Sequence, residues 1–275
     1  MTQVLIDADR LAEAMLSDRP PVVLDVRWQL GDPDGYRHYR DGHVPGAVFV
    51  DLDEHLAAPP ISEDGRHPLP DVGDLQVAAR SWGIDDGVPV VVYDDAGGTA
   101  AARAWWLLRW GGLDDVMILD GALDGWRAAG FRLSSGDATP RAGTVTLTPG
   151  GLPTVTIDDV ARGEVLLLDA RAAERFRGEV EPVDPRPGRI PGAVSAPTGE
   201  NLTGTGTFKT PDELRERFAG LGVQGDGAPV VVYCGSGITA AHQIAALAMA
   251  GIPAALFPGS YSQWSSDPER PIQTG

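Results

Sequence analysis

Short runs of apolar residues recur along the chain, separated by polar or glycine-containing segments. Four of them are rich in Val and Leu and contain no polar residue: residues 22–24, 90–92, 166–168 and 230–232. Continuous apolar runs of this length are typical of strands that are buried on both faces of a parallel sheet. Two further strands are predicted at 116–119 and 254–257, because each of these apolar runs is followed by a turn that contains glycine.

Helical segments follow two of the valine runs. After Tyr93, and again after Tyr233, a loop of small residues leads into an apolar stretch, which predicts helices over 100–110 and 240–250. Alternating strands and helices predict an α/β fold with a mainly parallel sheet and helices on both faces. Such sheets bind ligands at the carboxyl ends of their strands, where these two loops are expected to lie.

The chain repeats itself at a nearly constant distance. The pairs are 22–27 with 166–171, 43–48 with 189–194, 89–102 with 229–242 and, more weakly, 119–126 with 257–264. Their first residues are 144, 146, 140 and 138 positions apart. Similarity at a fixed distance indicates duplicated structural units. We therefore predict two copies of one domain, residues 1–140 and 154–275, joined by a stretch rich in Gly, Pro, Ser and Thr over 135–153.

Composition narrows the class of protein. The chain has 22 Lys+Arg against 39 Asp+Glu, a net charge of −17, which argues against nucleic acid or an anionic membrane as the main partner. A single cysteine excludes an internal disulfide and a cysteine-rich zinc site, and the histidines show no metal-ligand spacing. The first residues lack the pattern of a signal peptide, and polar residues interrupt the most apolar stretch, 238–257. We expect a cytoplasmic protein.

The charge is distributed unevenly between the copies. Residues 1–145 carry a net charge of −12 and residues 146–275 a net charge of −5. Five arginines fall within 171–189, at positions 171, 175, 177, 186 and 189. A local cationic cluster in an acidic protein suggests a site for a small anion, and the alternative is a solvated loop with scattered surface ion pairs.

The one cysteine stands where a thiol would be reactive. Cys234 directly follows a predicted strand and opens the loop Cys-Gly-Ser-Gly-Ile-Thr, which runs into a helix. Glycines allow a tight loop with inward-facing N–H groups, and the helix N-terminus adds a positive field, so the thiolate is favoured over the thiol. The alternative is a buried, inert cysteine. Asp94 occupies the matching position in the first copy, which argues against an apolar core position and predicts that this copy has lost the nucleophile.

Two other cysteine chemistries fit less well. Tyrosine-type phosphatases place an arginine six residues after the cysteine, and here that position holds Ala240. A cysteine protease needs a histidine base, and His242 on the following helix could point elsewhere. A short cradle of N–H groups suits a persulfide or a small sulfur anion.

With these motifs the chain resembles the tandem-domain rhodanese family of sulfurtransferases, in which the first domain is inactive and the second is active. The landmarks that carry the resemblance are Leu24–Trp28, 43–47, 92–94, 103–106, 120–121, 169–171, 190–193 and the Cys234 loop. The loop is similar to that of 3-mercaptopyruvate sulfurtransferases. Thiosulfate enzymes typically carry Arg and Lys in the loop, at the places of Gly235 and Ser236.

The resemblance implies a set of site residues. Cys234 would be the nucleophile, with Ser236, His67 and Asp53 as a proton-relay set, and Arg175 and Arg186 would bind the substrate. Arg189 competes with Arg186, because the segment between Glu181 and Arg186 departs from the family pattern. The remaining loop residues that would hold the sulfur anion are Gly235, Gly237, Ile238 and Thr239. Thr99 stands where the family commonly has tyrosine. No metal or organic cofactor is implied.

The implied reaction moves a sulfane sulfur from 3-mercaptopyruvate, through a Cys234 persulfide, to cyanide or to a thiol of a thioredoxin-like protein or small molecule. Splitting the transfer into two steps through a covalent intermediate makes each step easier. Two alternatives stay open. One is a thiosulfate sulfurtransferase on the same scaffold, and the other is a non-catalytic persulfide carrier or binding module. Anion hydrolysis is a lesser alternative, which Ala240 disfavours.

Overall fold

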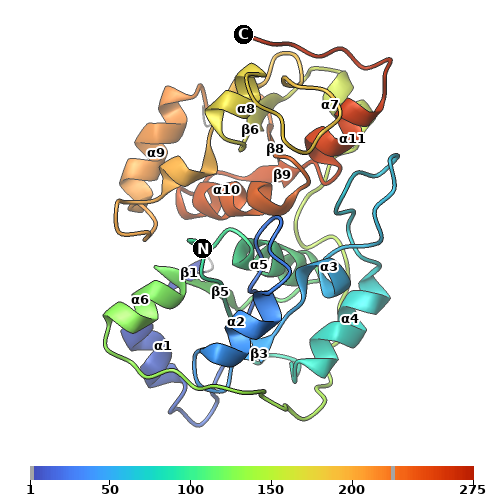
Figure 1. The fold of residues 1–275 in the computed structure, drawn as a ribbon. Helices are drawn as coiled ribbons and strands as arrows, with labels where there is room; N and C mark the ends of the chain where they lie inside the picture. Colours follow the sequence, from blue (N-terminus) through green and yellow to red (C-terminus); the bar gives the residue numbers. More distant parts are fainter. Residues whose placement is uncertain (1–2, 224–226) are drawn as a thin grey trace. The chain divides into compact units, whose positions relative to one another are not determined.

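The computed structural model describes residues 3–223 and 227–275 (Figure 1). They form two compact units. The N-unit comprises Met1–Leu56, Pro70–Leu152 and Gly204–Phe208, and the C-unit comprises Ala57–Leu69, Pro153–Thr203 and Lys209–Gly275. A short segment of the first half, residues 57–69, therefore belongs to the C-unit. Among the described residues no helix is long and apolar enough to cross a membrane.

The N-unit is built on a parallel sheet of five strands in the order β1-β5-β4-β2-β3. These strands are β1 (Leu5–Ile6), β2 (Val22–Asp25), β3 (Val48–Phe49), β4 (Val90–Tyr93) and β5 (Val116–Leu119). Its helices are α1 (Ala8–Ala14), α2 (Gly35–Asp41), α3 (Leu52–His55), α4 (Val72–Ser81), α5 (Ala101–Trp110) and α6 (Ala122–Ala128).

The C-unit repeats this topology with a parallel sheet in the order β7-β6-β8-β9. These strands are β6 (Leu166–Asp169), β7 (Val194–Ser195), β8 (Val230–Tyr233) and β9 (Ala254–Leu256). Its helices are α7 (Ile157–Ala161), α8 (Ala173–Arg177), the 3-10 turn η1 (Thr198–Asn201), α9 (Pro211–Gly220), α10 (Ile238–Met249) and α11 (Ser260–Ser266). The fifth strand position is reduced to one parallel bridge between Thr154 and Leu256.

The valine-rich strands are buried on both faces, as their pattern predicts. In β8, Val231 and Tyr233 pack into one apolar cluster with residues of α7 and α11. Successive side chains of a strand point to opposite faces, so Val230 and Val232 face the other side, where α10 contacts β8 and β9. In the N-unit β4 is arranged likewise, with α1 and α6 on one face and α5 on the other. The predicted α/β fold, two tandem domains with parallel sheets flanked by helices, is confirmed.

The details differ modestly from the predicted elements. Helix α10 begins at Ile238, two residues before the predicted start, and β9 ends at Leu256. The two-residue strands β1, β3 and β7 carry too little pattern to be recognised from sequence. The predicted linker 135–153 contains no helix and no strand, and it lies between α6 and α7.

Each unit carries the same buried ion pair at the carboxyl end of its central strands. Arg27 binds Asp25 at 2.7 Å, and Arg171 binds Asp169 at 2.6 Å. In both units the arginine also donates to the carbonyl of a glycine, Gly42 or Gly188, in the loop that leads to the Pro-Gly turn. The pair therefore ties this loop to the strand, and removing one partner would leave a buried charge uncompensated.

Candidate active site

Cys234 lies at the carboxyl end of β8, in the turn that leads into α10. The side chain is buried, and the N–H of Gly237 donates to its Sγ at 3.1 Å. Gly237 has a φ of 83°, a left-handed conformation that favours glycine. Helix α10 begins at the next residue, Ile238, so the sulfur faces the positive end of a twelve-residue helix, whose second residue is Thr239.

Residues at the start of α11 form hydrogen bonds with the backbone of this loop. Ser260 Oγ accepts a hydrogen bond from the N–H of Cys234 at 3.2 Å, and the N–H of Tyr261 donates to the Cys234 carbonyl at 3.0 Å. The N–H of Ser262 donates to the carbonyl of Gly235 at 2.9 Å. These bonds fix the backbone that carries Cys234, a role that sequence reasoning missed.

Ser260 also has an unusual backbone conformation, with a φ of 53°. A left-handed residue other than glycine costs on the order of 1 kcal/mol and persists where its surroundings require it. In the N-unit the corresponding residue, Ala122, has a φ of 54°. The weak repeat between 119–126 and 257–264 was the one signal that could have pointed to this shared corner.

The matching loop of the N-unit shows what such a turn binds. The buried Asp94 carboxylate accepts four backbone hydrogen bonds, from Ala96, Gly98, Ala100 and Ala101, at 2.8–3.0 Å. Burial raises the pKa of Asp94, and the four N–H donors act against this rise. The N-unit loop is thus an anion cradle that is filled by its own side chain.

Ser236 and His67 lie together in the C-unit. The Nδ1 of His67 is 2.7 Å from the Oγ of Ser236, which is only 6% exposed. His67 is close to this loop because residues 57–69 belong to the C-unit. Asp53, the third member of the predicted set, lies in the N-unit on α3, where it accepts a hydrogen bond from the indole N–H of Trp28 at 3.0 Å.

Arg175, near the end of α8, is held by two buried carboxylates. Its Nε and Nη2 bind Glu181 at 3.2 and 2.7 Å, and its Nη2 binds Asp184 at 3.0 Å. Burial favours a higher pKa for Glu181, but hydrogen bonds from Arg175 and from backbone N–H groups outweigh it and lower the pKa. Burial raises the pKa of Asp184, although Arg66 and Arg175 oppose the rise.

Arg66 is a second guanidinium at this place, and sequence reasoning did not find it. Its Nη1 is ion-paired with Asp184. A Cβ atom on Gly235 would lie 3.0 Å from Arg66 Nη2 and 3.4 Å from Arg175 Nη1, so both arginines flank the residue next to Cys234. Nothing in the sequence marks Arg66, because residues 57–69 have no counterpart among the repeated motifs.

Arg186 and Arg189 are placed differently. The guanidinium of Arg186 donates to the carbonyls of Trp264, Ser265, Asp267 and Arg270 and so ties down the end of α11. Arg189 donates to the carbonyl of Gly275 at 2.7 Å and stacks over the ring of Phe176. No contact described for either guanidinium joins it to the Cys234 loop.

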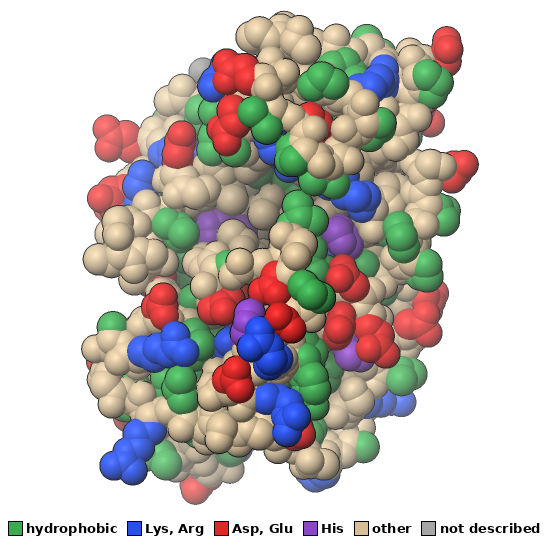
Figure 2. Space-filling model, in the orientation of Figure 1, with side chains coloured by type: hydrophobic (Ala, Val, Ile, Leu, Met, Phe, Trp, Pro, Cys, Tyr) green, Lys and Arg blue, Asp and Glu red, His purple; other side chains and the backbone are tan. Residues whose placement is uncertain are grey.

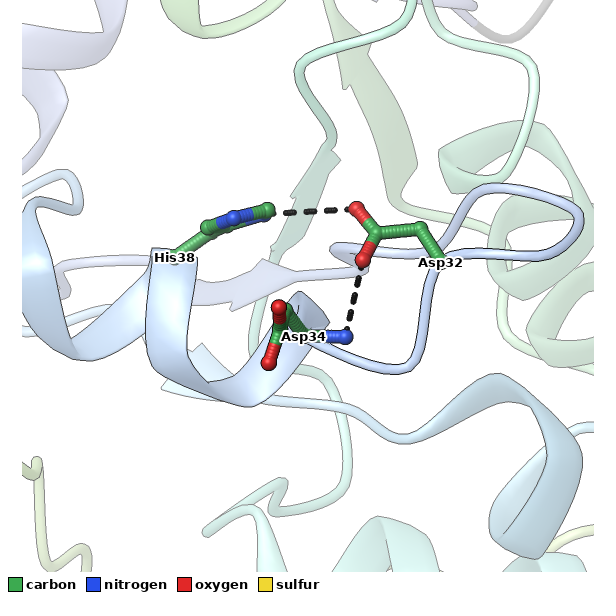
Figure 3. Close-up of side chains that lie close together, drawn as sticks. All are labelled: Asp32, Asp34 and His38. Carbon is green, nitrogen blue, oxygen red and sulfur yellow. Dashed lines mark hydrogen bonds and ion pairs between the residues drawn. The ribbon is translucent and has the colours of Figure 1, made fainter.

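Outside this site, the described residues contain one group that could offer metal ligands, Asp32, Asp34 and His38 at the start of α2 (Figure 3). The ring of His38 lies 3.5 Å from Oδ2 of Asp32, and Oδ1 of Asp32 accepts a hydrogen bond from the N–H of Asp34. These contacts account for the cluster as a local turn. On the face shown in Figure 2, acidic and basic side chains are interspersed and do not form a basic patch.

The fold and the site define a class of protein: two tandem α/β domains, one of which holds a buried cysteine in a tight turn between a strand and a helix. The model of the rhodanese-like domain matches residues 7–129 and again 153–267. The chain therefore belongs to the rhodanese family, and the resemblance noted in the sequence is confirmed.

Individual relatives span almost the full length. A protein of Mycobacterium tuberculosis named "Putative thiosulfate sulfurtransferase SseB" is 48% identical over 99% of this chain and 98% of its own. A protein of Pseudomonas aeruginosa named "Probable 3-mercaptopyruvate sulfurtransferase" is 45% identical over 98% of both chains. The crystal structure of SseA from Escherichia coli, described as a 3-mercaptopyruvate sulfotransferase, is 35% identical with a TM-score of 0.83, covering 94% of this chain and 99% of that one.

Proposed function

We propose that this protein is a sulfurtransferase that moves a sulfane sulfur from 3-mercaptopyruvate to a thiol or to cyanide through a persulfide on Cys234. The observation that carries the proposal is the Cys234 sulfur itself, buried at a helix N-terminus with the Gly237 N–H 3.1 Å away. A thiolate or a persulfide anion gains from such a donor, and its nucleophilicity depends on being ionised.

The cycle has two steps. The Cys234 thiolate attacks the donor sulfur, a sulfur–sulfur bond forms, and the sulfur–carbon bond breaks with its electron pair going to carbon as pyruvate enolate. The enolate takes a proton and leaves as pyruvate. An acceptor thiolate, or cyanide, then attacks the outer sulfur, and Cys234 departs as thiolate. The N–H groups of the turn from Gly235 to Thr239 stabilise the charge that develops on sulfur.

Ser236 and His67 supply the proton in this proposal. Their 2.7 Å contact lets a proton pass between imidazole and hydroxyl, and Ser236 lies two residues from the nucleophile. Asp53 stays in the proposal as the carboxylate that orients His67, on the family resemblance alone. Arg175 binds the donor carboxylate, because its planar guanidinium suits two-point binding of a carboxylate.

The choice of donor has one competitor, thiosulfate. The Cys234 loop carries no cation of its own, which favours the monoanionic 3-mercaptopyruvate. The name of the Mycobacterium tuberculosis relative and the guanidinium of Arg66 beside Gly235 favour the thiosulfate dianion. A small thiol or a thioredoxin-like protein in the cytoplasm is the proposed acceptor. A non-catalytic carrier would not need an arginine beside the cysteine turn.

The test compares the wild-type protein with Cys234→Ser. After treatment with donor, the intact mass of the wild type should rise by one sulfur atom, the increase should disappear with an acceptor, and the variant should show neither. Turnover by Cys234→Ser would show that Cys234 is not the nucleophile. Measuring kcat/KM for both donors on one preparation decides between them, and a thiosulfate preference above about tenfold, or about 1.4 kcal/mol, would overturn 3-mercaptopyruvate. If the wild type takes up the sulfur but does not pass it on in repeated turnover, the protein is a non-catalytic persulfide carrier.

A further inference from the structure

Two guanidinium groups converge on the residue that follows the nucleophile. Arg66 comes from the 57–69 segment and Arg175 from α8, and both belong to the C-unit. Their nearest atoms to a Cβ on Gly235 would be Arg66 Nη2 at 3.0 Å and Arg175 Nη1 at 3.4 Å. A side chain at position 235 would push into Arg66, so glycine leaves the space beside Cys234 to the two arginines.

Each arginine is held by carboxylates through some of its guanidinium nitrogens. Arg66 binds Asp184 through Nη1, and Arg175 binds Glu181 and Asp184 through Nε and Nη2. The nitrogens nearest to Gly235 are Arg66 Nη2 and Arg175 Nη1. Among the hydrogen bonds and ion pairs of the described residues, none uses Arg66 Nη2 or Arg175 Nη1. Two N–H donors thus face the cysteine turn while carboxylates hold the groups behind them.

Asp184 explains how two like charges can lie so close together. Its fully buried carboxylate gives one oxygen to each arginine. Glu181 adds a second negative charge on the far side of Arg175. The carboxylates offset the repulsion between the guanidiniums, and the arginines remain 28% and 18% exposed at their side chains, so a small solute can reach them.

We propose that Arg66 and Arg175 together bind the anionic group of the sulfur donor, that Arg66 takes the part expected of Arg186, and that Asp184 is the positioning residue for both. This inference rests on the proposed function for the identity of the donor, but not for the anion site itself. Two planar guanidiniums on one side of the turn hold a carboxylate at two points and so direct the neighbouring sulfur toward Cys234.

The test uses a reaction that needs no sulfur transfer. Iodoacetate and iodoacetamide both alkylate a thiolate with loss of iodide and are similar in size, but only iodoacetate carries a carboxylate. Cys234 is the single cysteine, so every alkylation of a thiol reports on this site, and Cys234→Ser gives the background from other side chains. The readout is the ratio of the two rate constants, measured by intact mass.

In Arg66→Ala the iodoacetate rate should fall about tenfold or more relative to the iodoacetamide rate, because a charge-assisted hydrogen bond is lost. Arg66→Lys should recover part of the ratio. The matched control is Arg177→Ala, which should leave the ratio unchanged. It removes an exposed arginine of the same helix as Arg175, and among the described residues this arginine pairs with Glu179. With 3-mercaptopyruvate, Arg66→Ala should raise KM more than it lowers kcat.

Failure of this inference differs from failure of the proposed function. If the wild type turns over the donor and Arg66→Ala leaves the alkylation ratio unchanged, the proposed anion site is wrong and the proposed enzyme activity stands. If Arg66→Ala lowers the ratio but the wild type does not turn over the donor, the anion site stands and the proposed sulfurtransferase activity is wrong. If both alkylation rates fall equally in Arg66→Ala and also in Arg66→Lys, Arg66 acts on the structure of the turn and the inference is wrong.

Discussion

The Nδ1 of His67 lies 2.7 Å from the Oγ of Ser236, although 169 positions separate the two residues in the sequence. The contact forms because residues 57–69 of the first copy belong to the C-unit, which also holds Cys234. The N-unit has no cysteine, yet the first half of the chain supplies the histidine beside the Cys234 turn.

Removing either partner of this pair should slow sulfur transfer. We expect His67→Ala to lower kcat about 10²-fold, the lower end for loss of a positioned proton donor. Ser236→Ala should have a similar effect, and the double variant should be little worse than either single one, because the two residues act as one path. The matched control is His38→Ala, which removes a histidine of the N-unit surface. Additive losses in the double variant would contradict a shared relay.

Arg186 should prove to be a structural residue. Its guanidinium donates to four backbone carbonyls around the end of α11. Arg186→Ala leaves these carbonyls without a donor and should cost about 2–4 kcal/mol of unfolding free energy, with an unchanged KM for the donor at a temperature where the variant is folded. Thermal melts and steady-state kinetics check both parts. A KM raised tenfold with an unchanged Tm would instead assign Arg186 to the substrate.

Most of the fold could be predicted from the internal sequence repeat. Buried valine runs such as 90–92 and 230–232 are long enough to show the two-sided burial of a parallel strand, and the matching loops place Asp94 and Cys234 in equivalent turns. The two-residue strands could not be predicted, because two residues do not make a pattern. The positive φ of Ser260 could not be predicted either, since its surroundings and not its residue type require it.

The candidate site was predictable only as far as a motif marked its residues. The Cys234 turn is contiguous and follows a strand, so its place could be inferred. Arg66 reaches the turn from a segment that packs into the other unit, and no local pattern indicates such an exchange. Arg186 was expected from the family resemblance, through a segment that matches the family pattern inexactly. Such a match cannot tell an arginine that faces a turn from one that binds four carbonyls.

Glu181 should make stability depend on acidity. Its pKa is lowered from the ordinary value of 4.5: burial opposes the ionised form, but Arg175 and the backbone N–H groups of Val183 and Asp184 together outweigh it. A carboxyl with a lower pKa in the folded state stabilises the fold above its unfolded pKa and loses this contribution as the pH falls through the folded value. Glu181→Gln should therefore melt below the wild type at pH 7, and the gap should narrow below about pH 4.5. Glu179→Gln, at an exposed pair with Arg177, is the control and should change little. A gap that stays constant with pH would contradict this role.

Asp94 should be essential to the stability of the N-unit because it fills its own cradle. Its Oδ1 accepts the N–H groups of Ala96 and Gly98, and its Oδ2 accepts those of Ala100 and Ala101. Asp94→Ala leaves four backbone donors, three of them buried and one half-buried, without an acceptor and should cost about 3–5 kcal/mol of unfolding free energy.

Asp94→Asn separates charge from shape. The amide keeps one oxygen but turns an N–H₂ group toward two N–H donors, so we expect this variant to be nearly as unstable as Asp94→Ala, whereas Asn at the exposed Asp114 should be neutral. Urea unfolding measures all three. If Asp94→Asn had the same unfolding free energy as the wild type, the loop around Asp94 would not prefer an anion to a neutral amide. The argument that the equivalent turn around Cys234 stabilises a sulfur anion would then lose its support from the N-unit.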